Sequence, residues 1–288
     1  MTAGQSHSPT VRRRQLIAEL KRLREAADFT QEDVAQRLDW HHTKVFRIET
    51  GRTGPHPNDV RVMLDVYGVT DHEQREALVQ LAKDARQRGW WYSYRDVLPG
   101  RYEFFVGLEE EAASIQTFEL AVVPGLLQTE DYARALARGG PLEFDPEEIE
   151  RRVEVRMTRQ QVLGKPDRPQ LWAILDEGAI RRIVGGPAVM YAQLQRLMTM
   201  SEQGKTTVQV VPYSVGAHPG TAGSFIILGF ADLGEIDVVY IETIGGNMSV
   251  DKPEEVRHYT TAFDHLRAVA LSPDDTRAML LAASEALE

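Results

Sequence analysis

Four polar side chains near the N-terminus have the types and the spacing of a nucleic-acid contact surface. His42, Thr43, Lys44 and Arg47 all carry hydrogen-bond donors and fall within one short stretch. On an α-helix, residues three or four positions apart lie on one face. Base edges in the DNA major groove present a distinguishable pattern of donors and acceptors, and phosphates attract cationic side chains. The spacing therefore predicts a helix over residues 42–49 that can hydrogen-bond to a duplex.

This helix needs a partner that holds it at a fixed angle. Residues 31–38 can form the partner, because Thr30 and Asp33 have the spacing of a capping box and Phe29 with Val34 that of a hydrophobic staple. A second helix starting directly after Thr30 is therefore expected.

The connection between these two helices is short and suits a steep crossing. Ala35 supplies the small side chain that closely crossing helices need. Asp39 tolerates the left-handed backbone conformation that the turn requires. The sequence thus predicts a helix-turn-helix in which residues 42–49 face outward.

Three more helices are expected to complete an all-α domain. An apolar stripe at spacings of four, three and four predicts a first helix over residues 12–27. Pro57 suits the first position of a fourth helix, and Thr70 with Glu73 has the capping-box spacing that would begin a fifth. The stripe consists of Leu16, Leu20, Leu23 and Ala27.

The net charge of −10 is unevenly distributed along the chain. Residues 1–70 carry a net charge of +2, and residues 71–288 carry −12. Since contacts to phosphates are local and screened within about 8–10 Å at cellular salt, an acidic body does not prevent a mildly basic head from binding DNA.

The first 70 residues resemble the Xre-type helix-turn-helix family. The resemblance rests on residues 20–38 and 44–51 and covers residues 12–70. It implies a five-helix, lambda-repressor-like domain in which Gln31 binds a phosphate, while His42, Thr43 and Arg47 face bases. The predicted DNA-binding residues are Gln31, His42, Thr43, Lys44, Arg47 and Arg52.

Two residues depart from that family's pattern. His41 occupies a position where the family often has a capping Ser, and Phe46 replaces a residue that is commonly small and polar. Phe46 has two interpretations: it contacts a thymine methyl group, or it turns inward.

The remaining two-thirds of the chain alternate between expected helices and strands. This pattern predicts an α/β domain with a small sheet, and hence an α+β class for the whole chain. The expected strands are residues 171–175, 208–212, 225–230 and 238–241, and the expected helices are 129–137, 145–163, 177–184, 187–203 and two that begin near Pro253 and Ser272.

This second portion resembles the C-terminal domain of a group of actinobacterial regulators that includes the WhiJ-like proteins. The resemblance rests on Trp90-Trp91, residues 123–134, 208–213 and 216–220, and it covers about residues 85–285. In that group the domain has no known biochemical activity and is sometimes labelled antitoxin-like. Its members are often encoded beside a small BldB-like protein, which implies a protein partner.

Two other features have competing interpretations. The aromatic run over residues 89–94 could stack on single-stranded bases, but its acidic neighbours favour a role in packing. Several acidic residues and one histidine could form an acid/base or metal site, but they lack any recognised catalytic or metal-binding spacing. We therefore predict no catalytic residues, no metal and no cofactor. The residues in question are Asp176, Glu177, His218, Glu242 and Asp251.

The sequence predicts a cytoplasmic, nucleoid-associated transcriptional regulator, most simply a repressor. We expect a disordered arm over residues 1–10, a DNA-binding domain over 11–85, and a domain over 86–288 that dimerises and binds a small partner or ligand. The alternative is an antitoxin-type protein that neutralises a small partner and autoregulates its own promoter. The chain has no cysteine, which excludes disulfides, and no apolar run long enough to span a bilayer.

Overall fold

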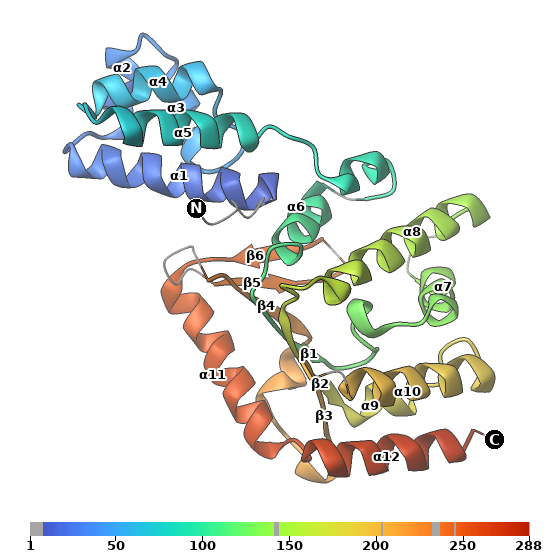
Figure 1. Cartoon of the computed structure of the whole chain (residues 1–288). Helices are drawn as coiled ribbons and strands as arrows, with labels where there is room; N and C mark the ends of the chain where they lie inside the picture. The colour runs from blue at the N-terminus through green and yellow to red at the C-terminus, as the bar shows by residue number, and fades with distance from the viewer. Residues whose placement is uncertain are drawn as a thin grey trace. The chain divides into compact units, whose positions relative to one another are not determined.

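The chain divides into two units, Met1–Tyr92, here called the head unit, and Ser93–Glu288, here called the sheet unit. The computed structural model describes residues 8–98, 100–140, 144–202, 204–231, 237–244 and 246–287. Within its described residues the head unit contains helices and no strand (Figure 1). Its α-helices are α1 (Pro9–Ala26), α2 (Gln31–Arg37), α3 (His42–Glu49), α4 (Pro57–Val66) and α5 (His72–Asp84).

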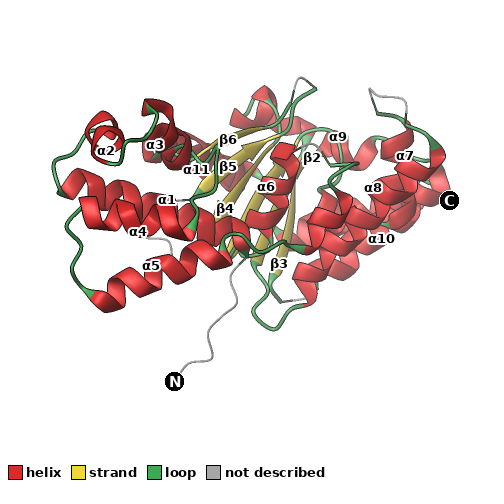
Figure 2. Cartoon of the chain, turned by 90° about the horizontal axis from the view of Figure 1, so that it is seen from above, coloured by secondary structure: helices red, strands yellow, loops and turns green. Residues whose placement is uncertain are grey.

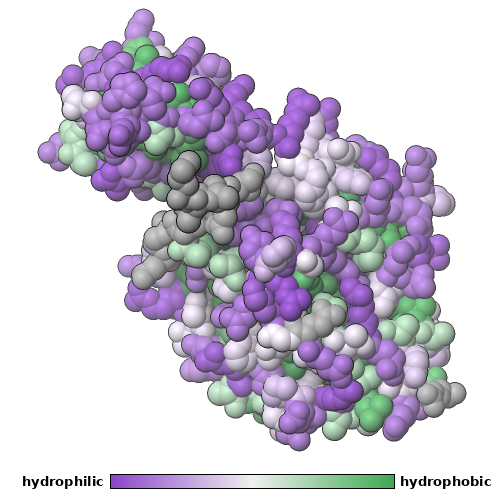
Figure 3. Space-filling model, in the orientation of Figure 1, coloured by the Kyte–Doolittle hydropathy of each residue, from purple (hydrophilic) through white to green (hydrophobic). Residues whose placement is uncertain are grey.

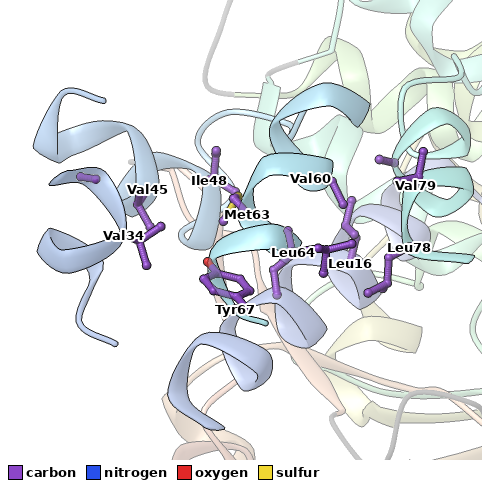
Figure 4. Close-up of a cluster of buried hydrophobic side chains, with 13 residues drawn as sticks. Leu16, Val34, Val45, Ile48, Val60, Met63, Leu64, Tyr67, Leu78 and Val79 are labelled. Atoms are coloured by element: carbon purple, nitrogen blue, oxygen red, sulfur yellow. The ribbon is translucent and has the colours of Figure 1, made fainter. Parts of the chain in front are cut away.

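The five helices enclose one apolar core. Leu16 and Leu20 of α1 are fully buried, and Leu23 and Ala27 pack at the edge of the same cluster. Figure 4 shows that the remaining labelled side chains come from the other helices and point into the same interior. The stripe predicted from the sequence is therefore the face of α1 that enters the core. The core members beyond α1 are Val34, Ala35, Val45, Ile48, Val60, Met63, Leu64, Tyr67, Leu78, Val79 and Ala82.

Two helix starts differ from the sequence prediction. Helix α1 begins at Pro9 because Ser8 caps it, accepting a hydrogen bond from the Val11 amide at 3.4 Å. The predicted arm was therefore too long by Pro9 and Thr10, while residues 1–7 lie outside the described residues. Helix α5 begins at His72 because Asp71, and not Thr70, accepts the capping hydrogen bond. The start of α4 at Pro57 is as predicted.

The sheet unit is built on a six-stranded mixed sheet with the order β3-β2-β1-β4-β5-β6 (Figure 1). Strands β1, β2 and β3 are parallel, whereas β4, β5 and β6 each run antiparallel to the preceding neighbour in that order. The predicted α+β class is confirmed. The strands are β1 (Ser114–Glu119), β2 (Gln170–Asp176), β3 (Thr206–Val211), β4 (Phe225–Gly229), β5 (Val238–Ile241) and β6 (Met248–Val250).

Helices lie on both faces of this sheet, as Figure 2 shows. On one face α11 packs Val256, Phe263 and Leu266 against apolar side chains of β1 to β6. The helices that precede and connect the parallel strands cover the other face, and α12 lies along α10 and β3. The helices are α6 (Gly100–Glu109), α7 (Glu130–Arg138), α8 (Pro146–Arg159), α9 (Glu177–Arg181), α10 (Pro187–Ser201), α11 (Pro253–Val269) and α12 (Pro273–Glu285).

Among the α-helices and strands that the structure describes, three were not expected from the sequence: α6, β1 and β6. The most consequential is β1, which lies inside the sheet between β2 and β4. Its sequence is rich in polar residues, yet Thr117 is 2% exposed.

The apolar residues are gathered mainly in the interior. On the face seen in Figure 3, hydrophilic side chains cover most of both units, and apolar ones occur in small scattered groups. Among the described residues, no helix has both the length and the apolar character needed to cross a bilayer.

Candidate nucleic-acid interface

Helix α2 starts where the capping box predicts. The Thr30 hydroxyl accepts from the Asp33 amide at 3.1 Å, and an Asp33 carboxylate oxygen accepts from the Thr30 amide at 2.8 Å. Hydrogen bonds from Thr30 lower the pKa of Asp33, so this cap is complete at neutral pH. Phe29 packs against the core that contains Val34, as expected for a staple. The first helix of the motif is therefore fixed by local interactions.

The turn between α2 and α3 uses the residues predicted for it. Asp39 has φ of 51°, in the left-handed region, and the Trp40 amide donates to the Ala35 carbonyl at 2.8 Å. His41 replaces the expected Ser as the cap of α3: its Nδ1 lies 3.4 Å from the Thr43 amide and 2.9 Å from the Thr43 hydroxyl oxygen. The histidine thus performs the capping role of the residue that it replaces.

The outer face of α3 presents His42, Thr43, Phe46 and Arg47 to solvent. Phe46 is 41% exposed, which answers the question left open by the sequence: its ring turns outward. The guanidinium of Arg52 lies 5.4 Å from the centre of that ring. This face therefore combines hydrogen-bond donors with one exposed apolar surface.

Lys44 and Gln31 are engaged within the protein. The Lys44 ammonium lies 2.8 Å from an Asp59 carboxylate oxygen and 3.6 Å from the centre of the Trp40 ring. The Gln31 amide donates to Glu49 at 2.7 Å. The His42 ring packs on His41, with 4.3 Å between the ring centres. Lys44 and Gln31 are therefore less available to a duplex than Arg47, a distinction that the sequence did not reveal.

A buried ion pair joins the three helices that form this surface. Arg24 of α1 donates to both carboxylate oxygens of Glu49 at the end of α3, at 2.7 and 3.0 Å, and to the Phe29 carbonyl at 2.6 Å. The side chains of Arg24 and Glu49 are only 9% and 2% exposed. Hydrogen bonds to Glu49 raise the pKa of Arg24. With Gln31 of α2 on the same carboxylate, this group fixes the angle between α1, α2 and α3. Sequence reasoning assigned Glu49 no role.

In the sheet unit, some of the residues considered for catalysis do come together. His218 Nε2 lies 3.3 Å from an Asp176 oxygen, whose partner oxygen accepts from the Gly178 amide at 2.7 Å. Glu177 accepts from the Tyr213 amide at 2.8 Å. These contacts hold the loop after β3 against the end of β2.

The other two candidates lie elsewhere in the sheet unit. Glu242 directly follows β5, and Asp251 directly follows β6; both are exposed. The five residues considered in the sequence analysis therefore do not form one site.

Comparison with protein families finds two matches. Residues 15–78 match a helix-turn-helix domain, and residues 102–282 match a domain of unknown function, DUF5753, which covers more than half of the chain. The chain belongs to the DUF5753 family. A comparison with curated proteins and with solved structures found no match. The helix-turn-helix match lies within the head unit and supports a DNA-binding regulator, while the DUF5753 match covers most of the sheet unit.

Proposed function

We propose that this DUF5753 protein is a sequence-specific transcriptional repressor that reads DNA with α3. The observation that carries the proposal is a donor-rich, solvent-facing helix surface held by a buried ion pair. A buried Arg–carboxylate pair with several hydrogen bonds has little freedom to reorient. The surface is therefore presented to a duplex in one fixed orientation, which keeps the entropy cost of recognition low.

The exposed side chains have distinct proposed roles. Arg47 has the fork geometry that suits guanine O6 and N7 in the major groove, and His42 can donate to an acceptor on a neighbouring base. Phe46 can contact a thymine methyl group. Lys44, Gln31 and Arg52 are proposed to contact phosphates; Lys44 would exchange its Asp59 partner for a phosphate oxygen.

We predict that Arg47→Ala weakens binding to the preferred duplex by about 1–3 kcal/mol and relaxes base preference at one position. The preferred duplex is first selected from a randomised pool with the unaltered chain. Lys44→Ala is the matched comparison on the same helix, and it should weaken binding to all duplexes by a similar factor. Titrations of both variants against the selected duplex and against single-base changes distinguish these patterns. Unchanged binding by Arg47→Ala would contradict the assignment of α3.

We also propose that the protein binds DNA as a homodimer. One helix-turn-helix head covers too few base pairs for high specificity, and dimers of such heads bind half-sites about one helical turn apart. Light scattering at micromolar concentration should give twice the chain mass of 32.4 kDa, and the selected duplex should be a palindrome. A mass of one chain together with an asymmetric duplex would rule out this arrangement.

The sheet unit is proposed to control the head unit by binding a small protein partner or a ligand. Its size exceeds what is needed to hold two heads together, and it lies in the part of the chain that carries the excess negative charge. A bound molecule changes DNA affinity only if it binds differently to the DNA-competent state and to the other state.

A further inference from the structure

A cluster of polar side chains lies on the sheet face opposite α11. Phe118 of β1 packs towards α11, so the next residue, Glu119, points to the other face. In β5 the same alternation applies: Val239 and Ile241 pack towards α11, and Tyr240 points away from it. Glu119 and Tyr240 therefore share the face that is covered by α6 and α8.

The strand register brings two carboxyl groups to one end of this face. Extending the register by one residue beyond Phe118↔Phe225 and by two beyond Ile226↔Tyr240 aligns Glu119, Ser224 and Glu242 at the ends of β1, β4 and β5. Ser224 hydrogen-bonds to Glu119, and the charge of Glu242 acts on Glu119, as this alignment requires. Tyr240 of β5 lies two residues before Glu242 and therefore on the same face. Two carboxyl groups thus flank one small hydroxyl residue, next to a tyrosine.

The Tyr240 hydroxyl has no hydrogen-bond partner among the described residues, although the side chain is only 2% exposed. Its ring stacks on Phe105 of α6 with 4.0 Å between the ring centres. Burial raises the pKa of Tyr240, and the nearby charge of Glu242 raises it further, as expected for a hydroxyl that faces the cluster. A buried polar group without a partner is destabilising. A bound molecule that donates to the Tyr240 oxygen would remove this penalty.

Glu119 is surrounded by protein but still reaches solvent. The Thr117 hydroxyl donates to it at 3.2 Å, and Ser224 provides a second side-chain hydrogen bond. Burial, followed by the charge of Glu242, raises the pKa of Glu119 to about 8, and Arg156 of α8 opposes this only in part. Glu119 as a whole residue is half-buried, and Glu242 is exposed. Rotation of the exposed Glu242 side chain is fast, and we expect a ligand to enter on that side of the cluster.

We propose that this cluster binds the ammonium group of a small primary amine and that the amine is the effector of the sheet unit. The effector role rests on the proposed function as a DNA-binding regulator. An ammonium group carries three donors and no acceptor. Glu119, Glu242 and the Tyr240 oxygen can supply three acceptors.

Other cations fit less well. The nearby charge of Arg159 is balanced by Glu109 at 2.7 Å. Arg156 donates to the neutral Gln128 amide oxygen at 2.6 Å and keeps its charge, which offsets one of the two carboxylates. When both carboxylates are ionised, one negative charge remains, which suits a cation of a single charge. Divalent cations in proteins take more oxygen ligands than two carboxylates provide. Among the described residues, no three acidic or histidine side chains converge in a way that could hold a metal.

The test uses the full chain and measures its thermal unfolding midpoint with millimolar n-butylammonium or 1,4-diaminobutane. Tetramethylammonium at the same concentration is the control, because it has the charge but no N–H donor. We expect the primary amines to raise the midpoint of the sheet unit and tetramethylammonium to leave it unchanged. If n-butylammonium, 1,4-diaminobutane and tetramethylammonium shifted the midpoint equally, the proposed ammonium site would be ruled out.

Two variants locate the binding. Tyr240→Phe keeps the stacked ring and removes only the hydroxyl, so the amine-free midpoint should not fall, while the amine-dependent shift should be lost. Glu242→Gln should also lose the shift. Tyr67→Phe is the matched control, since the Tyr67 hydroxyl is likewise buried without a partner, but in the head unit. A shift retained in Tyr240→Phe, or a fall in its amine-free midpoint, would overturn the proposal.

The effector role has a separate readout. Affinity for the selected duplex is measured with and without n-butylammonium, at constant ionic strength. A several-fold change that Tyr240→Phe abolishes supports the role, and an unchanged affinity overturns it. Failure of the chain to bind any duplex would instead contradict the proposed function, while the midpoint shift would still report on the amine site.

Discussion

Replacement of Arg24 by alanine is expected to lower the free energy of unfolding of the head unit by about 3–5 kcal/mol. The change would leave the carboxylate of Glu49, whose side chain is 2% exposed, without its cationic partner. Gln31 alone cannot balance that charge. Since Arg24 and Glu49 connect α1 with α3, the loss should also release the outer face of α3. Urea unfolding measures the free energy, and hydrogen exchange shows whether the amides of α3 lose protection.

Arg22→Ala is the matched control for this prediction. Arg22 lies on the same helix and pairs with Glu19 at 2.6 Å, but its side chain is 60% exposed. An exposed pair of this kind contributes little to stability, because water screens the two charges and both side chains must be ordered to meet. If Arg24→Ala cost no more than Arg22→Ala, the ion pair would not be what fixes the motif.

The corresponding buried ion pair of the sheet unit joins Arg159 and Glu109. Replacement of Arg159 by alanine is expected to lower the free energy of unfolding of the sheet unit by about 3–5 kcal/mol as well. Arg159 of α8 donates to both oxygens of Glu109 of α6, at 2.8 and 2.7 Å, and also contacts the Tyr102 hydroxyl. Burial alone would lower the pKa of Arg159, but the charge of Glu109 outweighs it and the pKa is raised. Urea unfolding, monitored by circular dichroism, gives the change in the free energy of unfolding.

A double replacement separates the charge from the packing. Arg159→Met with Glu109→Leu removes both charges and keeps apolar volume, so it should recover much of the stability lost in Arg159→Ala. Arg134→Ala serves as the comparison at the surface, because the carboxylate partners of Arg134 (Glu130, Asp131 and Glu150) are all more than half exposed, and we expect a smaller loss of stability there than in Arg159→Ala. If the double variant were as unstable as Arg159→Ala, the stability lost in Arg159→Ala would come from lost packing and not from the unpaired charge of Glu109.

Much of the head unit could be predicted from the sequence, because short-range interactions specify it. The capping box of Thr30 and Asp33 spans four residues, and the left-handed turn depends on Asp39 alone. The apolar stripe of α1 is likewise a property of one helix. Patterns of this kind do not depend on distant parts of the chain, so local reasoning finds them.

Tertiary structure decided which of the predicted contact residues are available. Lys44 meets Asp59 and Gln31 meets Glu49 through contacts between separate helices, and no local pattern reveals such partners. The outward direction of Phe46 is also set by how α3 sits on the core, which buries Val45 and Ile48 and leaves Phe46 outside.

The polar cluster of the sheet unit was beyond the reach of sequence analysis for a related reason. Strand β1 has polar residues at positions that an interior strand usually fills with apolar ones, so no strand was expected there. Glu119 and Glu242 are more than a hundred residues apart and become neighbours in a row only through the order β1-β4-β5. Sequence determined the local helices and their caps. The sheet register, which joins distant segments by backbone hydrogen bonds, decided which side chains meet.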